Sequence, residues 1–289
     1  MAASSKAQDS FARQSPTFTF AAESYVAHGG QDRYLKPIIA YFGTTPIAEI
    51  VPWDVRQMAM TIYPDPHYQN STRNRQALTP TRAVMMHAYE RGWCPLIRLK
   101  RFKVPERKRK TPASHGWMQV FMRQCDRDSL PHLAALVLFM SQTGARISEA
   151  VRLEWREVDL NGRTAILLKT KTTTNSVRHL TDEMVTRMRA LSAAKNPDDR
   201  VFRYRCRHSV NERIAAVCDR AGISYKSPMM CGRHAFATNA INAGVDIKTA
   251  MEAGDWKSSV VFLETYVHTK NAGRTVADRF NSMSFDPDI

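Results

Sequence analysis

The chain has 289 residues, 43% of them apolar, which is enough for two ordinary domains with a core in each. Lys and Arg outnumber Asp and Glu by 42 to 27, and the net charge of +15 is typical of a nucleic-acid-binding protein, although a membrane surface or an acidic protein would also fit it. The five cysteines form no C-x-x-C pair, and no apolar run reaches about eighteen residues, so a disulfide framework, a zinc site and a membrane span are not indicated. We expect a cytoplasmic protein with reduced thiols.

The first part of the chain is predicted to be helical. Residues 1–16 are small and polar and end in proline, which is typical of a disordered arm. Residues 17–97 place apolar side chains at helical spacing in four stretches, each closed by glycine or proline: 18–28, 32–42, 52–62 and 71–91. Because no strand pattern interrupts them, they predict a small all-α domain.

The last of these helices carries Arg73, Arg75 and Arg82 among several serine, threonine and asparagine residues. Charges of this kind usually form a solvated face. The alternative is a helix face that binds the DNA backbone. The residues alone leave both interpretations open.

Residues 98–113 are predicted to be a basic linker. From Arg98 to Lys110, eight basic residues stand against one glutamate, a net charge of +7, and so dense a block repels itself unless a polyanion covers it. The segment is either a solubilising tether or a linker that follows a phosphate backbone, and its position between two domains favours the second. The side chains assigned to DNA binding here are Lys100, Arg101, Lys103, Arg107, Lys108, Arg109 and Lys110.

Residues 114–289 are predicted to form a second domain of mixed structure. Helical runs cover 116–125 and 130–141, and the second is almost wholly apolar, as a buried core helix would be. A period-two pattern follows, which predicts a three-stranded antiparallel meander. Its strands are expected at 158–160, 164–168 and 176–180, and further helices at 183–194 and 209–221. The fold class is therefore mainly α with a small antiparallel sheet (α+β).

Two motifs carry the functional signal. The first runs from Thr143 to Trp155 as TGARISEAVRLEW, with an arginine at a helix start and a glutamate three residues later on the same face. The second, 230–268, holds an Arg-His pair, an Asn-Ala-Gly break, a tryptophan and a tyrosine. Together they resemble the signature blocks of the tyrosine recombinases, or phage integrases, whose first block reads T-G-x-R-x-S-E-x-x-x-L-x-W. The resemblance implies a helical core-binding domain that contacts DNA, followed by a catalytic domain.

The resemblance also implies a reaction, DNA cleavage without metal, nucleotide or other cofactor. Arg146 and Arg233 match the two family arginines, and guanidinium forks suit the non-bridging oxygens of a phosphate as charge grows on them. Glu149 then holds Arg146 in place. Tyr266 matches the nucleophile, whose phenol forms a 3′-phosphotyrosyl link that conserves the bond energy.

Two further roles follow from the same comparison. Lys171, on the turn between the second and third strands, matches the lysine that protonates the leaving 5′-oxygen, with Lys169 as the alternative. Trp256 matches a residue that contacts the phosphate, and its indole N–H can only donate. A core aromatic is the alternative for Trp256.

The chain departs from the family pattern at Met230, where a histidine usually helps to deprotonate the tyrosine, and at Gly232, where the family carries leucine. A thioether is not a useful proton acceptor at neutral pH. Cleavage either proceeds without this assistance, or uses another histidine, or is lost. His234 matches the second family histidine, which normally packs or forms a hydrogen bond.

We therefore expect a site-specific recombinase that acts on double-stranded DNA as a tetramer in the cytoplasm of a bacterium or on behalf of a phage, close to the nucleoid. An accessory directionality factor is a further candidate partner. Two alternatives remain: a DNA-binding regulator of the same fold with weakened or lost cleavage, which Met230 favours, and a monomeric type IB topoisomerase, which shares the chemistry. No membrane partner is expected.

Overall fold

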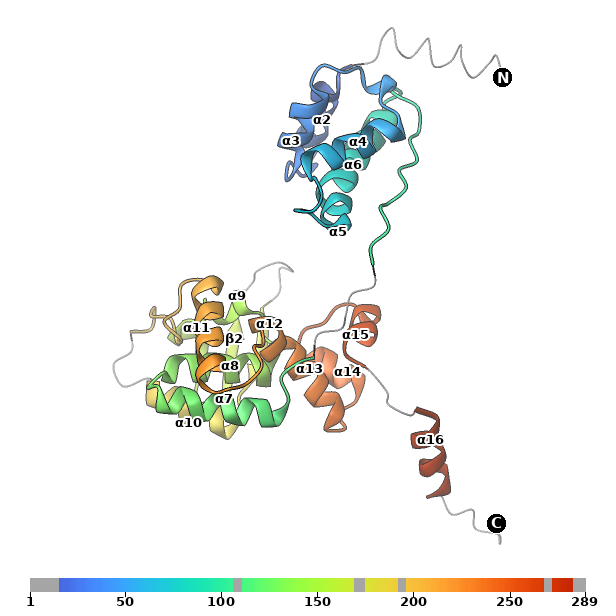
Figure 1. The fold of residues 1–289 in the computed structure, drawn as a ribbon. Coiled ribbons are helices and arrows are strands. Elements are labelled where there is room, and N and C mark those ends of the chain that lie inside the picture. Colours follow the sequence, from blue (N-terminus) through green and yellow to red (C-terminus); the bar gives the residue numbers. More distant parts are fainter. Residues whose placement is uncertain (1–15, 106–110, 169–174, 192–195, 268–271, 283–289) are drawn as a thin grey trace. The chain divides into compact units, whose positions relative to one another are not determined.

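The computed structural model describes residues 16–105, 111–168, 175–191, 196–267 and 272–282 (Figure 1). The chain divides into two compact units, Met1–Lys108 and Arg109–Ile289. Of the predicted arm, 1–16, only Pro16 is described. The side chains of Arg107, Lys108, Arg109 and Lys110 lie outside the described residues.

The described part of the N-terminal unit is all-helical, as predicted. Thr17 caps the first helix by accepting a hydrogen bond from the backbone N–H of Phe20, and Gly43, with φ at +46°, ends the second. Pro52 occupies the first turn of the third, where its missing N–H costs nothing. The helices are α2 (Phe18–Ala27), α3 (Leu35–Phe42), η1 (Ile47–Glu49), α4 (Pro52–Ile62), α5 (Asn70–Arg73), the π-helical segment η2 (Asn74–Leu78) and α6 (Thr79–Glu90).

The first half of the basic segment packs against this unit. Leu99 and Phe102 are buried in its core, beside residues from α3, α4 and α6. The side chain of Asn74 brackets Phe102, with Nδ2 donating to its carbonyl oxygen at 2.9 Å and Oδ1 accepting from its N–H at 2.8 Å. Residues 98–105 are therefore docked rather than free, because apolar side chains at two positions of a basic run provide an inward face that the charge count hides.

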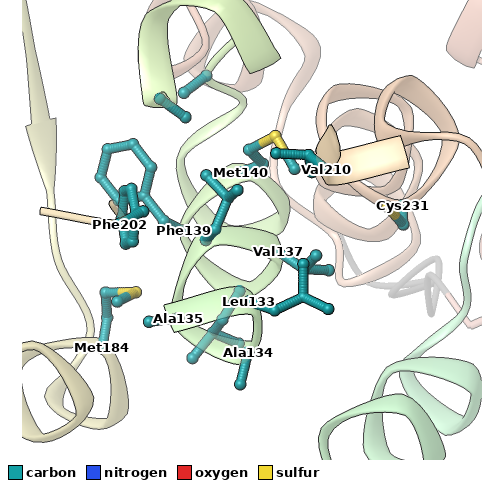
Figure 2. Close-up of a cluster of buried hydrophobic side chains, with 14 of the residues drawn as sticks. Leu133, Ala134, Ala135, Val137, Phe139, Met140, Met184, Phe202, Val210 and Cys231 are labelled. Atoms are coloured by element: carbon teal, nitrogen blue, oxygen red, sulfur yellow. The ribbon is translucent and has the colours of Figure 1, made fainter. Parts of the chain in front are cut away.

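The C-terminal unit is built around one buried helix, α8 (Pro131–Thr143), whose side chains from Leu133 to Met140 are all buried. Figure 2 shows Phe139 of this helix beside Phe202. Met184, Val210 and Cys231 are further side chains of the same core. A helix apolar on every side must be surrounded. The surrounding helices are α7 (His115–Arg127), α9 (Ile147–Ala150), α10 (Asp182–Leu191), α11 (Arg207–Arg220), α12 (Pro228–Cys231) and α13 (Arg233–Asn242).

The predicted meander is confirmed as a three-stranded antiparallel sheet in the order β1-β2-β3. Its strands are β1 (Val158–Asp159), β2 (Thr164–Leu167) and β3 (Ser176–His179), and the 3-10 turn η3 (Trp155–Glu157) precedes them. The register pairs Ala165 with Arg178 and Ile166 with Val177. The strands are shorter than expected at their ends, and the turn that carries Lys169 and Lys171 lies outside the described residues.

The end of the chain adds three helices, α14 (Ile247–Ala253), α15 (Ser259–Tyr266) and α16 (Ala272–Asn281). Together with α13, the first two enclose a separate small core of Ala237, Ala250, Phe262 and Tyr266. On α16 the apolar side chains Val276 and Phe280 are 51% and 60% exposed. Among the helices of the described ranges, none has the length and apolar character needed to cross a membrane.

Candidate active site

Arg146 stands immediately before α9, where Glu149 holds it by two contacts. The Glu149 carboxylate accepts a hydrogen bond of 2.8 Å from the backbone N–H of Arg146, and its other oxygen lies 2.6 Å from Nη1 of the same residue. The Glu149 side chain is only 6% exposed, whereas that of Arg146 is 45% exposed. The Arg146 guanidinium therefore reaches solvent while Glu149 fixes its position.

Arg233 begins α13, is 9% exposed, and ties two loops together. Its Nη1 donates hydrogen bonds of 2.7 Å to the carbonyl oxygens of Gly144 and Gly254, and its Nη2 donates one of 3.2 Å to that of Asp255. A guanidinium has five N–H donors, so the Nε–H and one Nη2–H have no partner among the described residues. Burial, followed by the charge of Arg146, lowers the pKa of Arg233 to about 10, and it stays charged at neutral pH.

Two glycines near Arg233, Gly144 and Gly232, lie where a side chain would collide with neighbouring residues. Gly144 ends α8 with φ at +67°, and a Cβ there would lie 2.9 Å from the ring of Phe236. At Gly232 a Cβ would lie 2.7 Å from the carbonyl oxygen of Pro228 and 2.8 Å from the Cβ of Met140. A side chain at position 232 would therefore collide with the backbone of α12 and with Met140 of α8.

Trp256 follows a tight turn at the end of α14. Asp255 has a left-handed backbone with φ at +56°, and a Cβ on Gly254 would overlap the indole ring of Trp256. The Lys257 ammonium lies 2.8 Å from the Asp255 carboxylate and lowers the pKa of that carboxyl. The Cζ of Arg233 lies 3.5 Å from the centroid of the Trp256 ring, a cation–π contact. Arg233 therefore contacts the Trp256 indole and also binds the carbonyl groups of the turn that precedes it.

Tyr266 is the last residue of α15, a helix whose first turn is capped by the Ser258 hydroxyl. It is 7% exposed, and its ring packs edge-on against His234 at 4.8 Å and Trp256 at 5.4 Å between centroids. Phe262 lies at 5.1 Å on the same helix. The nucleophile candidate is therefore positioned by aromatic neighbours on α13, α15 and the Trp256 turn.

Of the two positions where the family pattern carries histidine, this chain keeps His234 and has Met230 at the other. Burial, followed by the charge of Arg233, lowers the pKa of His234, which favours a neutral imidazole. Met230 is 8% exposed in α12, and its carbonyl oxygen accepts a hydrogen bond of 3.1 Å from the N–H of Ala113. The methionine is a packed side chain at the entry to the C-terminal unit.

Arg178 belongs to this region, although its sequence motif did not suggest it. The residue lies on β3, is 2% exposed, and donates from Nη1 to the carbonyl oxygen of Ala253. Burial lowers the pKa of Arg178, while the carboxylates of Glu149 and Asp255 raise it. A signal was available: Arg178 is two residues before the apolar Leu180, and alternate residues of a strand share a face.

The cations predicted to bind DNA differ in their exposure. Arg73 is 3% exposed, and its guanidinium donates to the Tyr63 carbonyl oxygen and lies 2.8 Å from the Asp65 carboxylate. It is thus a structural residue of the N-terminal unit in this conformation, and the expected DNA contact needs correction there, because a helix pattern cannot tell which arginine points inward. The remaining described cations of the set are exposed: Arg75, Arg82, Lys100, Arg101 and Lys103.

Arg82 also binds the docked segment, because its Nη2 donates to the carbonyl oxygen of Leu99 at 2.6 Å. Within the described ranges, no group of three or more His, Cys, Asp or Glu side chains is arranged to hold a metal ion. The candidate site of the C-terminal unit thus consists of arginines, aromatic side chains and the two carboxylates of Glu149 and Asp255.

Comparison with known proteins identifies a family and several structures of similar fold. A model described as the phage integrase family matches residues 117–272. Among solved structures, the Tn1549 transposon integrase in complex with a circular intermediate DNA is 15% identical with a TM-score of 0.71, over 92% of this chain and 100% of that one. A search of curated proteins finds no match.

Two other solved structures share the fold. The XerA recombinase is 14% identical with a TM-score of 0.51, over 96% of this chain and 100% of its own. A lambda integrase dimer bound to a COC′ core site is 11% identical with a TM-score of 0.59, over 87% of this chain and 77% of its own. At such identities the likeness establishes the architecture.

Proposed function

The chain belongs to the phage integrase family, and we propose that it is a site-specific DNA recombinase that cuts and rejoins double-stranded DNA through a tyrosine. One observation carries the proposal. The Arg233 guanidinium bonds both the loop before Arg146 and the turn before Trp256, whose ring lies against Tyr266. Side chains separated by up to 120 positions (266 − 146) thereby form one cluster.

The proposed reaction transfers a phosphoryl group and leaves the number of phosphoester bonds unchanged. The Tyr266 oxygen attacks the phosphorus, the bond to the 5′-oxygen breaks, and a 3′-phosphotyrosyl link forms. Attack by the 5′-hydroxyl of another strand reverses the step and releases the tyrosine. No ATP is required, because each bond broken is replaced by one of similar energy.

The arginines serve the transition state in this mechanism. The exposed guanidinium of Arg146 and the two N–H donors of Arg233 that have no partner among the described residues neutralise the non-bridging oxygens, and preorganised donors of this kind are worth about 10²–10³ in rate each. The indole N–H of Trp256 donates a further hydrogen bond. Lys171, or Lys169 in its place, protonates the leaving 5′-oxygen; both lie outside the described residues.

DNA binding is proposed for both units. The solved relatives in complex with DNA include the Tn1549 integrase, XerH and lambda integrase. In this chain the exposed cations Arg75, Arg82, Lys100, Arg101 and Lys103 offer contacts to phosphates. We assign residues 17–97 to core binding and 114–289 to catalysis, and the basic segment to the phosphate backbone between them.

Self-association on DNA is the remaining part of the proposal. The exposed Val276 and Phe280 lie four positions apart on α16 and therefore share one face. This face suits docking on a neighbouring subunit of a tetramer, and packing on its own unit is the alternative. Sedimentation with and without a DNA site distinguishes the two.

The decisive experiment uses a nicked suicide substrate, in which the cleaved strand loses a short fragment and religation is blocked. Wild-type protein is expected to form a covalent protein–DNA adduct, and Tyr266→Phe is expected to form none. A wild-type protein that binds a site without forming an adduct would support the second candidate, a DNA-binding regulator with lost cleavage. The buried Met230, in place of a proton acceptor, favours that candidate.

A further inference from the structure

Strand β3 buries Arg178 and exposes the adjacent apolar residue Val177. Arg178 pairs with the small Ala165 of β2 and is 2% exposed, while its neighbour Val177 is 54% exposed. A register shift of one residue would reverse this and bury the valine. The sheet therefore places a charge on its inner face at the expense of a hydrophobic side chain.

Burying a guanidinium is unfavourable unless its donors are well satisfied. Arg178 has only part of that compensation, because its buried Nε–H has no acceptor among the described residues. Burial also lowers its pKa. Replacing such a group with an apolar side chain of similar volume is often neutral or stabilising in proteins. Overall stability is thus a poor explanation for the arginine.

Within the described ranges, the acceptor that Arg178 binds lies next to the proposed site. Its Nη1 donates to the carbonyl oxygen of Ala253, the last residue of α14, and Arg233 donates to the carbonyl oxygens of the next two residues, Gly254 and Asp255. Three consecutive carbonyl groups at a helix C-terminus, where cations are favoured, are therefore bound by two buried guanidiniums. The residue that follows is Trp256.

We propose that Arg178 is a positioning residue that fixes the turn 253–256, and with it the Trp256 indole, against Arg233 and Tyr266; this rests on the function proposed above. Trp256 has its ring centroid 3.5 Å from the Arg233 guanidinium and 5.4 Å from that of Tyr266. Arg233 alone holds two of the three carbonyls, so the turn could still pivot about Ala253. At 2% exposure Arg178 does not reach the DNA itself.

The test compares Arg178→Met with Arg178→Lys and with His179→Met, a matched control on the outward face of the same strand. In Arg178→Met, amide hydrogen exchange in residues 253–257 should be at least about tenfold faster, as expected when a hydrogen bond to a charged donor is lost, while exchange in α8 stays unchanged. Adduct formation on nicked DNA should slow about a hundredfold without a change in DNA affinity. Arg178→Lys should recover part of both effects, and His179→Met should match wild type.

A double-mutant cycle with Trp256→Phe then links Arg178 to the indole. If Arg178 acts through Trp256, the two losses of cleavage rate are less than additive. Unchanged exchange in the turn, or equally faster exchange throughout α8, overturns the proposal. Hydrogen exchange decides it even if wild-type protein forms no adduct, an outcome that would instead refute the proposed function.

Discussion

The Nη1 of Arg233 lies 2.7 Å from the carbonyl oxygen of Gly144, 89 positions earlier in the chain. This bond links the two sequence motifs, because Gly144 belongs to the first, with Arg146, and Arg233 belongs to the second. A substitution at Arg233 should therefore affect both the chemistry and the stability of the fold.

For Arg233→Lys we expect a loss of adduct formation of at least about a hundredfold, because an ammonium group cannot offer a planar fork to the phosphate. The free energy of unfolding should also fall, by about 1–3 kcal/mol for each buried carbonyl left without a donor. Suicide-substrate cleavage and urea unfolding measure the two effects. Arg123→Lys, on the exposed face of α7, should change neither. A stable, fully active Arg233→Lys protein would contradict the proposed site.

Substituting Gly254 tests the position of the indole. A Cβ there overlaps the ring of Trp256, so Gly254→Ala must displace the indole from Arg233. We expect cleavage to slow about a hundredfold, while circular dichroism and DNA affinity stay near wild type. Gly116→Ala is the control, because its Cβ meets nothing within 4 Å, and alanine in a helix is favoured by about 0.5–1 kcal/mol. Normal cleavage by Gly254→Ala would show that the indole position is unimportant.

The helices and the two motifs could be predicted because their signals are local. The apolar run at 130–141 indicates a buried helix by its composition, and Arg146 with Glu149 meets within one turn. For Arg178, alternation along the strand indicates the inward face but not the partner, since Ala253 is 75 positions away and comes from the packing of a helix on the sheet. Arg73 shows the same limit, because its inward direction depends on Tyr63 and Asp65.

Asn74 should hold the docked part of the basic segment. Its amide accounts for two hydrogen bonds to Phe102, so Asn74→Ala leaves a buried N–H and a buried carbonyl unpaired. We expect faster hydrogen exchange in residues 98–105 and a loss of about 1–3 kcal/mol per group in the stability of the N-terminal unit. Arg75→Ala, at an exposed position of the same π-helical segment, should leave exchange in 98–105 unchanged. Equal exchange in both variants would show that the apolar side chains alone dock the segment.

The stability of the C-terminal unit should depend on pH through His234. Its pKa is below the ordinary value of 6.5, so in that range the unfolded chain binds a proton that the folded chain does not. The contribution of this residue is therefore fully present above pH ~6.5 and is lost as the pH falls toward the folded-state pKa. In urea unfolding at several pH values, His234→Gln should lose less stability on acidification than wild type. Because the pKa of His132 is also lowered, the free energy of unfolding of the variant should still depend on pH to some extent. An identical slope in both proteins would exclude His234 as a source.

Met230 stands where the family pattern carries a histidine, and replacing it tests whether a proton acceptor at this position speeds cleavage. We expect Met230→His to form the covalent adduct faster, by up to about a hundredfold, because an imidazole can accept the phenol proton. The side chain is 8% exposed, so an unpaired imidazole should also cost about 1–3 kcal/mol of stability. Met229→His is the matched control, since its side chain is 54% exposed and on the adjacent residue, and it should leave both quantities unchanged. Unchanged or slower cleavage by a folded Met230→His protein would mean that the packing around this methionine has replaced the histidine-assisted arrangement, so that the proton leaves Tyr266 by another route.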